Sequence, residues 1–254
     1  MSFLTNTLVP ALIVAAIVNT IAMASTTVYL HRAVSHKALT LHPFVEWLFR
    51  AAIWLTTGIK PKQWAAVHRK HHAFTDSEGD PHSPVLLGWQ KVQAGNVGLY
   101  RKALSDPQII DRYARDVVDD RWDRWFFGHH LFGLGTGIAV LIIVLGPVGG
   151  LLAAFIHTNA YLAGNAAVNA LGHHFGKRTY TNSAATNLQW LAFFTMGEGL
   201  HNNHHAAPSS PRLSHRRGEI DPGWWLIKLL TKARLATLRF DDIKLVASAR
   251  TPAA

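Results

Sequence analysis

The apolar residues of this chain gather into long uncharged runs. Residues 8–30 form such a run of 23 residues, long enough to cross roughly 30 Å of hydrocarbon as a helix. A cleaved signal peptide would need a basic segment ahead of the run, and Met1–Val9 has none. Two further runs, 131–145 and 148–171, are separated by Gly146-Pro147, which predicts a tight hairpin between two antiparallel helices. The pattern predicts three membrane-spanning helices.

Two shorter apolar runs cover residues 44–59 and 186–200. Sixteen helical residues reach only about 24 Å, so a full crossing is marginal. If both runs lie in the membrane interface, every charged block falls on one side, which the positive-inside rule names as the cytoplasm. We therefore expect an external N-terminus and one domain, 1–254, in which 31–125 and 172–254 form a cytoplasmic cap.

The charged residues lie outside the long apolar runs. The net charge is +10 and only 16% of residues are charged, well below the roughly 25% of soluble domains. Residues 1–30 and 126–171 carry no Lys, Arg, Asp or Glu. A basic chain can bind nucleic acid, but charged blocks between apolar runs are typical of a bilayer protein, so we expect membrane lipids and no nucleic acid as partners.

These patterns predict an all-α integral membrane protein. A few transmembrane helices would lie under a cytoplasmic helical cap. Within the cap, the polar segment Asp106–Arg124 has an amphipathic pattern that predicts a helix. A second helix is expected to start at Asp221-Pro222.

Histidine is the unusual component of the composition. The chain has 16 His and no Cys, which excludes disulfides, thiolate metal sites and cysteine nucleophiles. Three clusters each follow an apolar run: His31-Arg32-Ala33-Val34-Ser35-His36, His68-Arg69-Lys70-His71-His72 and His201-Asn202-Asn203-His204-His205. An HxxHH pattern is expected by chance roughly 0.06 times in such a chain, so two copies are a specific signal.

Helical geometry gives these clusters a chemical meaning. Offsets of three and four place side chains on one face of an α-helix, so each HxxHH presents three imidazoles together. The HxxxxH pair would be about 140° apart on an α-helix and would bracket a site. Packing or pH sensing is the alternative.

The remaining histidines have plainer interpretations. We expect the following to be surface or satisfied core residues: His42, His82, His129, His130, His174 and His215. For His157, inside a predicted span, a functional role and a helix–helix hydrogen bond are equally plausible.

The number of clustered ligands bears on the choice of metal. Neutral imidazole suits zinc, copper, iron and nickel. Eight or more ligands exceed one tetrahedral zinc, and a zinc hydrolase would need about three ligands and a general base. With no thiolate and no evident carboxylate pairing, an all-histidine di-iron site fits best.

These residues resemble the membrane fatty-acid desaturase family, in its Δ9 acyl-CoA and acyl-lipid branch. The resemblance covers about residues 31–240. Besides the three histidine clusters it includes Asp80-Pro81-His82, Asn169-Ala170-Leu171-Gly172-His173, Gly197-Glu198-Gly199-Leu200 and Glu219-Ile220-Asp221-Pro222.

The resemblance implies the site and its cofactors. Two iron ions, cycling between Fe2+ and Fe3+, would be held by His31, His36, His68, His71, His72, His173, His201, His204 and His205. Asn169 would reach a metal through water. The implied reaction uses O2 and two external electrons to introduce a cis double bond, at Δ9, into a saturated acyl chain.

The resemblance also implies partners and a location. The substrate would be a fatty acyl group linked to CoA, to a carrier protein or to a lipid. Electrons would come from a separate protein such as a ferredoxin or one of cytochrome b5 type. We expect a bacterial inner-membrane enzyme with its active site on the cytoplasmic side.

Three alternatives remain at this stage. The same di-iron chemistry can hydroxylate an acyl chain or form an alkyne. A non-enzymatic membrane metal-binding or transport protein is the third, although a transporter is expected to place its ligands near the bilayer midplane. Two departures from the family pattern stand out. Only one span fits before the first histidine cluster, where two are usual. Ala15 occupies the position at which the family can close the end of its acyl tunnel, and so small a residue there predicts that a long acyl chain is admitted.

Overall fold

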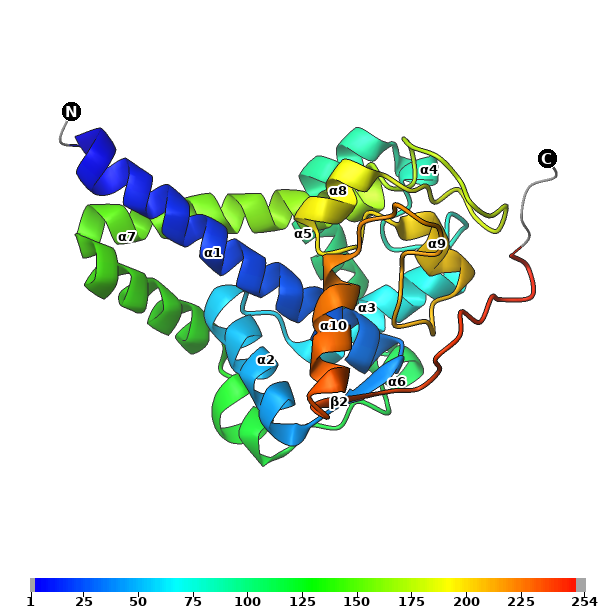
Figure 1. The fold of residues 1–254 in the computed structure, drawn as a ribbon, viewed down its shortest axis with the longest axis horizontal. Coiled ribbons are helices and arrows are strands. Elements are labelled where there is room, and N and C mark those ends of the chain that lie inside the picture. Colours follow the sequence, from blue (N-terminus) through cyan, green and yellow to red (C-terminus); the bar gives the residue numbers. More distant parts are fainter. Residues whose placement is uncertain (1–2, 250–254) are drawn as a thin grey trace.

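The computed structural model describes residues 3–249, and Figure 1 shows that they form a mostly helical fold. The first element is one continuous helix, Leu4–Ser35, composed of η1 (Leu4–Leu8), α1 (Val9–Ser25) and η2 (Thr26–Ser35). It is long and apolar enough to cross a membrane. Its outer face exposes Leu12, Ile13, Ile17 and Ile21, as a lipid-facing surface requires.

The second long apolar helix is α7 (His130–Ala170), which also has the length and composition of a membrane span. Its backbone breaks at Gly146, whose φ of 74° is not helical. Figure 1 shows α7 turning back on itself there, beside the N-terminal half of α1. A Cβ atom on Gly150 would lie 2.5 Å from Ile142 Cα, so the two arms of α7 approach closely enough near the bend to require glycine.

Helix α2 (Pro43–Thr56) packs against the first arm of α7 at glycines. A Cβ atom on Gly137 would lie 2.2 Å from the Leu55 carbonyl oxygen, whereas one on Gly135 would have no neighbour within 4 Å. We therefore expect Gly137→Ala to lower the free energy of unfolding by about 1–3 kcal/mol through overpacking.

Gly135→Ala is the matched control, because it adds the same methyl group to the same helix arm without a clash. It should leave stability unchanged or raise it by up to about 1 kcal/mol through helix propensity. Thermal unfolding midpoints in detergent measure both. Equal midpoints for the two variants would contradict the close contact between α2 and α7.

The rest of the chain builds a cap of shorter helices. These are α3 (Pro61–Phe74), α4 (Pro84–Leu87), α5 (Trp89–Leu104), α6 (Ile109–Tyr113), η3 (Asp123–Phe127), α8 (Gln189–Phe194), α9 (His201–Ala206) and α10 (Pro222–Lys232). Strand β1 (Leu39–Leu41) pairs antiparallel with β2 (Ala236–Leu238), and Leu39 and Leu41 face the core while Thr40 is exposed. The predicted fold class, an all-α membrane protein, is confirmed, with one small sheet added.

The helix predicted over Asp106–Arg124 is mostly wrong. Only α6 (Ile109–Tyr113) and the short η3 turn form in that region. The acidic side chains between them bind cations on neighbouring elements instead: Asp116 pairs with Arg69 at 2.6 Å and Asp120 with Arg50 at 2.8 Å. These ion pairs keep the segment close to α2 and α3. In contrast, α10 starts at Pro222 as expected, with the Asp221 carboxylate accepting from the Trp224 N–H.

Candidate metal centre

Four parts of the fold bring the predicted ligands together. His31 and His36 come from the end of η2, and His68, His71 and His72 lie on α3. His173 follows α7, and α9 carries His201, His204 and His205. All nine therefore meet where the apolar helices join the cap.

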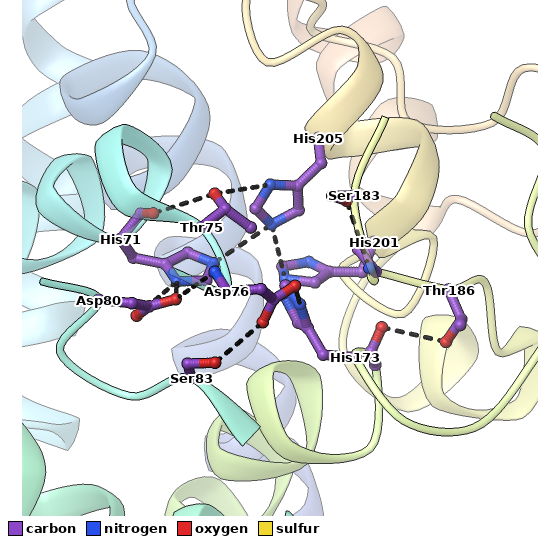
Figure 2. Close-up of polar contacts among 12 residues, drawn as sticks. His71, Thr75, Asp76, Asp80, Ser83, His173, Ser183, Thr186, His201 and His205 are labelled. Atoms are coloured by element: carbon purple, nitrogen blue, oxygen red, sulfur yellow. Dashed lines mark hydrogen bonds and ion pairs between the residues drawn. The ribbon is translucent and has the colours of Figure 1, made fainter. Parts of the chain in front are cut away.

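The nine histidines form two clusters, and within each cluster the ligand nitrogens lie within 4.8 Å of one another. The five-histidine cluster contains His31, His36, His68, His72 and His204. The four-histidine cluster contains His71, His173, His201 and His205, and Figure 2 shows these four rings converging. Both α3 and α9 contribute to both clusters, so each HxxHH segment supplies rings to two candidate metal positions.

The first pair of histidines departs from the α-helical expectation. Residues Thr26–Ser35 form a π-helix, and the His36 N–H donates to the His31 carbonyl over 3.1 Å. In i→i+5 bonding, residues five apart lie about one turn apart, rather than about 140° around an α-helix. The wider turn therefore brings both rings into one cluster instead of placing them on either side of it.

Burial keeps the clustered imidazoles in the form that binds metals. Burial, followed by the charges of neighbouring histidines, holds the pKa well below the usual 6.5 for His36, His68, His72, His201, His204 and His205. At neutral pH these rings are neutral, and a metal ligand must be deprotonated.

Three carboxylates orient the rings. Asp80 lies 3.0 Å from His71 Nδ1, Asp76 lies 2.8 Å from His173 Nδ1, and Glu198 lies 2.8 Å from His31 Nδ1. Figure 2 shows the first two pairs. Each carboxylate accepts the Nδ1–H, which leaves the Nε2 lone pair facing the cluster, the usual arrangement around metal-bound histidine. Sequence reasoning missed all three, although Asp80 and Glu198 lie within motifs that it noted.

Glu198 belongs to a buried polar network. Its carboxylate accepts from Thr27 Oγ1, and the Arg32 guanidinium lies 3.9 Å away. Burial acts to raise the pKa of Glu198, but His31, Arg32 and Thr27 outweigh it and lower the pKa. Arg32 also binds Asp221 at 2.9 Å. The network connects η2 to the loop before α9 and to the start of α10.

The donor set fits metal ions. His204 Nε2 lies 3.0 Å from His31 Nε2 and 2.8 Å from His72 Nε2. His31 already uses its Nδ1–H on Glu198, so its Nε2 offers only a lone pair. His173 Nε2 is buried without a hydrogen-bond partner among the described residues. Converging lone pairs and a buried unpaired nitrogen are what a bound cation satisfies.

His82 is a buried core residue rather than a surface residue, and it lies beside the four-histidine cluster. Its ring is buried and stacks on His71 at 4.7 Å, and with Asp80 it forms a third potential ligand group. Burial lowers the pKa of His82 to about 3, and its side chain hydrogen-bonds Asn169. The feature of the sequence that could have identified His82 is its position two residues after Asp80. Asn169 itself lies beside the cluster, where His82 and His201 line the same cavity.

That cavity has a volume of about 90 Å³. Its lining combines histidines of the clusters (His31, His68, His201) with Thr26, Tyr100 and Val168. A hollow of about 330 Å³ adjoins it and shares Trp64, Asn96, Tyr100 and Asn165. The two together form a mainly apolar path to the clusters.

Ala15 lines neither of these two cavities, so the effect of its small side chain on the length of the acyl chain stays a prediction. Its side chain is buried between Ala11 and Ala153, because α1 packs closely on α7 at that level. Closer to the centre, Thr26 Oγ1 and Tyr161 Oη form a buried hydrogen bond of 2.6 Å between the first helix and α7.

The isolated histidines take structural positions. His157 Nε2 donates to the Thr56 carbonyl over 2.9 Å, a bond between helices α7 and α2. His42 caps α2 by accepting from the Phe44 N–H, and His215 contacts Tyr180 Oη at 3.1 Å. His129, His130 and His174 lie outside the clusters.

The lowered pKa values predict how the metal-free protein responds to acid. The six rings bind protons in the unfolded chain near pH 6.5 but only at lower pH when folded. At pH values between the folded-state pKa and the unfolded-state pKa of these rings, the unfolded state binds more protons. The free energy of unfolding therefore falls as the pH drops below about 6.5. We expect a lower unfolding midpoint at pH 5.5 than at pH 7.5, measured by tryptophan fluorescence. A constant midpoint would contradict the buried, neutral clusters.

Fold and site together define a class: a helical membrane protein whose two histidine clusters suit a pair of metal ions. Comparison with known proteins specifies the family. Residues 7–218 match the sequence profile described as fatty acid desaturase, and the chain belongs to the fatty acid desaturase family.

Relatives of known name agree with this assignment. Delta-9 acyl-lipid desaturase 1 of Arabidopsis thaliana is 31% identical over 93% of this chain and 76% of its own length. Delta-9 desaturase-like 5 protein of the same plant is 33% identical over 87% and 72%. The sn-1 stearoyl-lipid 9-desaturase of Synechocystis sp. is 29% identical over 86% and 67%.

Proposed function

We propose that this protein is an O2-dependent fatty acyl desaturase that introduces a cis double bond at Δ9 of a saturated acyl chain. The observation that carries the proposal is the pair of histidine clusters beside a mainly apolar path. Relatives named as Δ9 acyl-lipid desaturases support the regiochemistry and favour a lipid-linked substrate over CoA and carrier-protein thioesters.

Two irons are the proposed cofactors. Five histidines would hold one ion and four would hold the other, with Asn169 reaching the second through water and His82 lying beside it. When bound, the irons supply the oxidant that removes hydrogen from unactivated C–H bonds, which no side-chain base can do. The overall reaction is –CH2–CH2– + O2 + 2 e⁻ + 2 H⁺ → –CH=CH– + 2 H2O.

The protein's own residues perform the remaining tasks. Asp76, Asp80 and Glu198 fix the orientation of three ligand rings. The cavity walls at Thr26, Val168 and Tyr100 bind methylene groups, each contributing roughly 0.8 kcal/mol when buried. When these walls hold the acyl chain against the clusters, they position its reacting carbons and exclude water.

The proposed setting is an inner membrane with the metal centre on the cytoplasmic side. Two long apolar helices support the membrane location, and the grouping of charge in the cap supports the side. Electrons would come from a separate protein, either a ferredoxin or one of cytochrome b5 type. The 254 residues contain no cysteine that could ligate an iron–sulfur cluster.

The test is expression in a bacterium that lacks its own desaturase, followed by analysis of fatty acid methyl esters with location of the double bond. A new Δ9 cis monoene and about two irons per purified chain are the expected results. Product mass separates the related chemistries: a gain of 16 indicates a hydroxylase and a loss of 4 an acetylenase. Zinc or no metal in the purified protein, with no new product when ferredoxin and its reductase are supplied, would refute the proposal.

A further inference from the structure

Beyond the acyl path, a second depression reaches the metal centre from outside. This depression, called here the His36–His72 hollow, has a volume of about 350 Å³ and is lined by Ser35, His36, Arg69, His72, Ala73 and Ser209. His36 and His72 belong to the five-histidine cluster and are partly exposed, whereas all four members of the other cluster are buried. The hollow shares no lining residue with the cavity beside the clusters.

Several hydrogen bonds and an ion pair hold the wall of the hollow in place. Arg69 Nε donates to the Ser35 carbonyl over 2.7 Å, and its other nitrogens bind the Val34 and Tyr113 carbonyls. Asp116 holds the same guanidinium. Because these bonds fix α3 against the end of η2, the edges of His36 and His72 remain at the surface without any rearrangement.

The C-terminal segment connects the two sides of the hollow. The Arg239 N–H donates to the Ala38 carbonyl, just after His36, and the Val246 N–H donates to the Ala206 carbonyl, just before Pro208. Figure 1 shows this segment running from β2 past α9. At the hollow, two cationic side chains share one carboxylate: Asp116 pairs both with the lining residue Arg69 and with Lys37, so positive charge is in excess there.

We infer that the His36–His72 hollow is the docking site of an acidic one-electron carrier protein, and that electrons enter the metal centre at the five-histidine cluster. The inference rests on the proposed function, which requires two external electrons per turnover. Each of two reduced carriers would lose one electron, and the two electrons would reduce two bound ferric ions to ferrous ions. Because the acyl path opens elsewhere, the carrier can dock while the acyl chain is in place.

The test uses the full-length, iron-loaded protein in lipid nanodiscs, with an acidic plant-type [2Fe–2S] ferredoxin as the probe. Ala73→Glu and Ser209→Glu each add a carboxylate at the rim of the hollow without changing a proposed ligand. Ala94→Glu is the matched control, because Ala94 is exposed on α5 and does not line the hollow. Iron content and circular dichroism verify that each variant is intact.

We expect each rim variant to bind ferredoxin roughly tenfold more weakly than the wild type, as added like charge slows association. The Ala94→Glu variant should bind normally, and binding should weaken between about 0.1 M and 0.5 M salt. Carbodiimide cross-links from ferredoxin carboxylates should map to Lys37.

Two results would overturn the docking site. One is wild-type affinity in both rim variants, and the other is a wild type that binds neither this ferredoxin nor the soluble domain of cytochrome b5. Either result leaves the proposed function intact if the wild type contains iron and produces a monoene in cells. A wild type without iron and without product would refute the proposed function itself.

Discussion

Replacing His71 or His204 with alanine is expected to abolish desaturation, with a loss of at least roughly 100-fold, since even residues that only orient ligands change metal affinity or activity by 10–100-fold. The two positions test the two clusters separately. His71 belongs to the four-histidine cluster, and His204 belongs to the five-histidine cluster, where its Nε2 faces both His31 and His72. Each variant should retain about one iron per chain, measured by plasma emission spectrometry alongside methyl ester analysis.

The control for this pair is His174→Ala. His174 is exposed and lies outside both clusters, so its loss should leave iron content and product at wild-type levels. Full activity in His71→Ala or His204→Ala would remove that residue from the site. Lost activity with two irons retained would instead indicate a role other than ligation.

Asp76→Asn is expected to weaken metal binding at the four-histidine cluster by roughly 10–100-fold, the usual effect of removing a carboxylate that orients a ligand. Asp76 accepts from His173 Nδ1 at 2.8 Å, and the amide of asparagine is a weaker, uncharged acceptor. The backbone tolerates the change, because Asp76 has φ of 58°, a conformation in which asparagine is favoured. Metal affinity is measured by competition with a chelator.

Asp106→Asn provides the matched control. Asp106 is partly exposed and pairs only loosely with Lys70, at 3.8 Å, so its neutralisation should leave metal affinity unchanged. A metal affinity of Asp76→Asn equal to that of the control would show that His173 is oriented without the carboxylate.

The membership of the site could be predicted from sequence more fully than its division into clusters. The repeated HxxHH pattern identifies the imidazoles, and the structure brings all nine expected histidines together, although each HxxHH segment divides its three rings between the two clusters. Which metal position each ring serves depends on how α3 and α9 pack against η2, and no local pattern encodes that packing. The π-helical turn at His31 and His36 also depends on its tertiary surroundings, because propensity gives no warning of it.

Residues that orient or contact the ligand rings were harder to predict from the sequence. Asp76 and His173 are 97 positions apart, so their contact exists only in the folded chain. His82 has no periodic partner and looks like any isolated histidine until the loop after α3 places it against His71. The predicted helix over Asp106–Arg124 failed for a related reason: its acidic residues form ion pairs with α2 and α3 that outweigh local propensity.

Sequence neighbours on α3 and α9 serve different clusters, and this determines the spacing of the two metal positions. His71 and His72 are adjacent, as are His204 and His205, yet in each pair one ring faces each cluster. Adjacent residues on a helix are separated by a rotation of about 100°, so backbone geometry holds the two positions apart. Substituting a single side chain would remove a ligand from one candidate position, but it would leave the separation of the two positions unchanged. A different separation between the metals would require the helices themselves to pack differently.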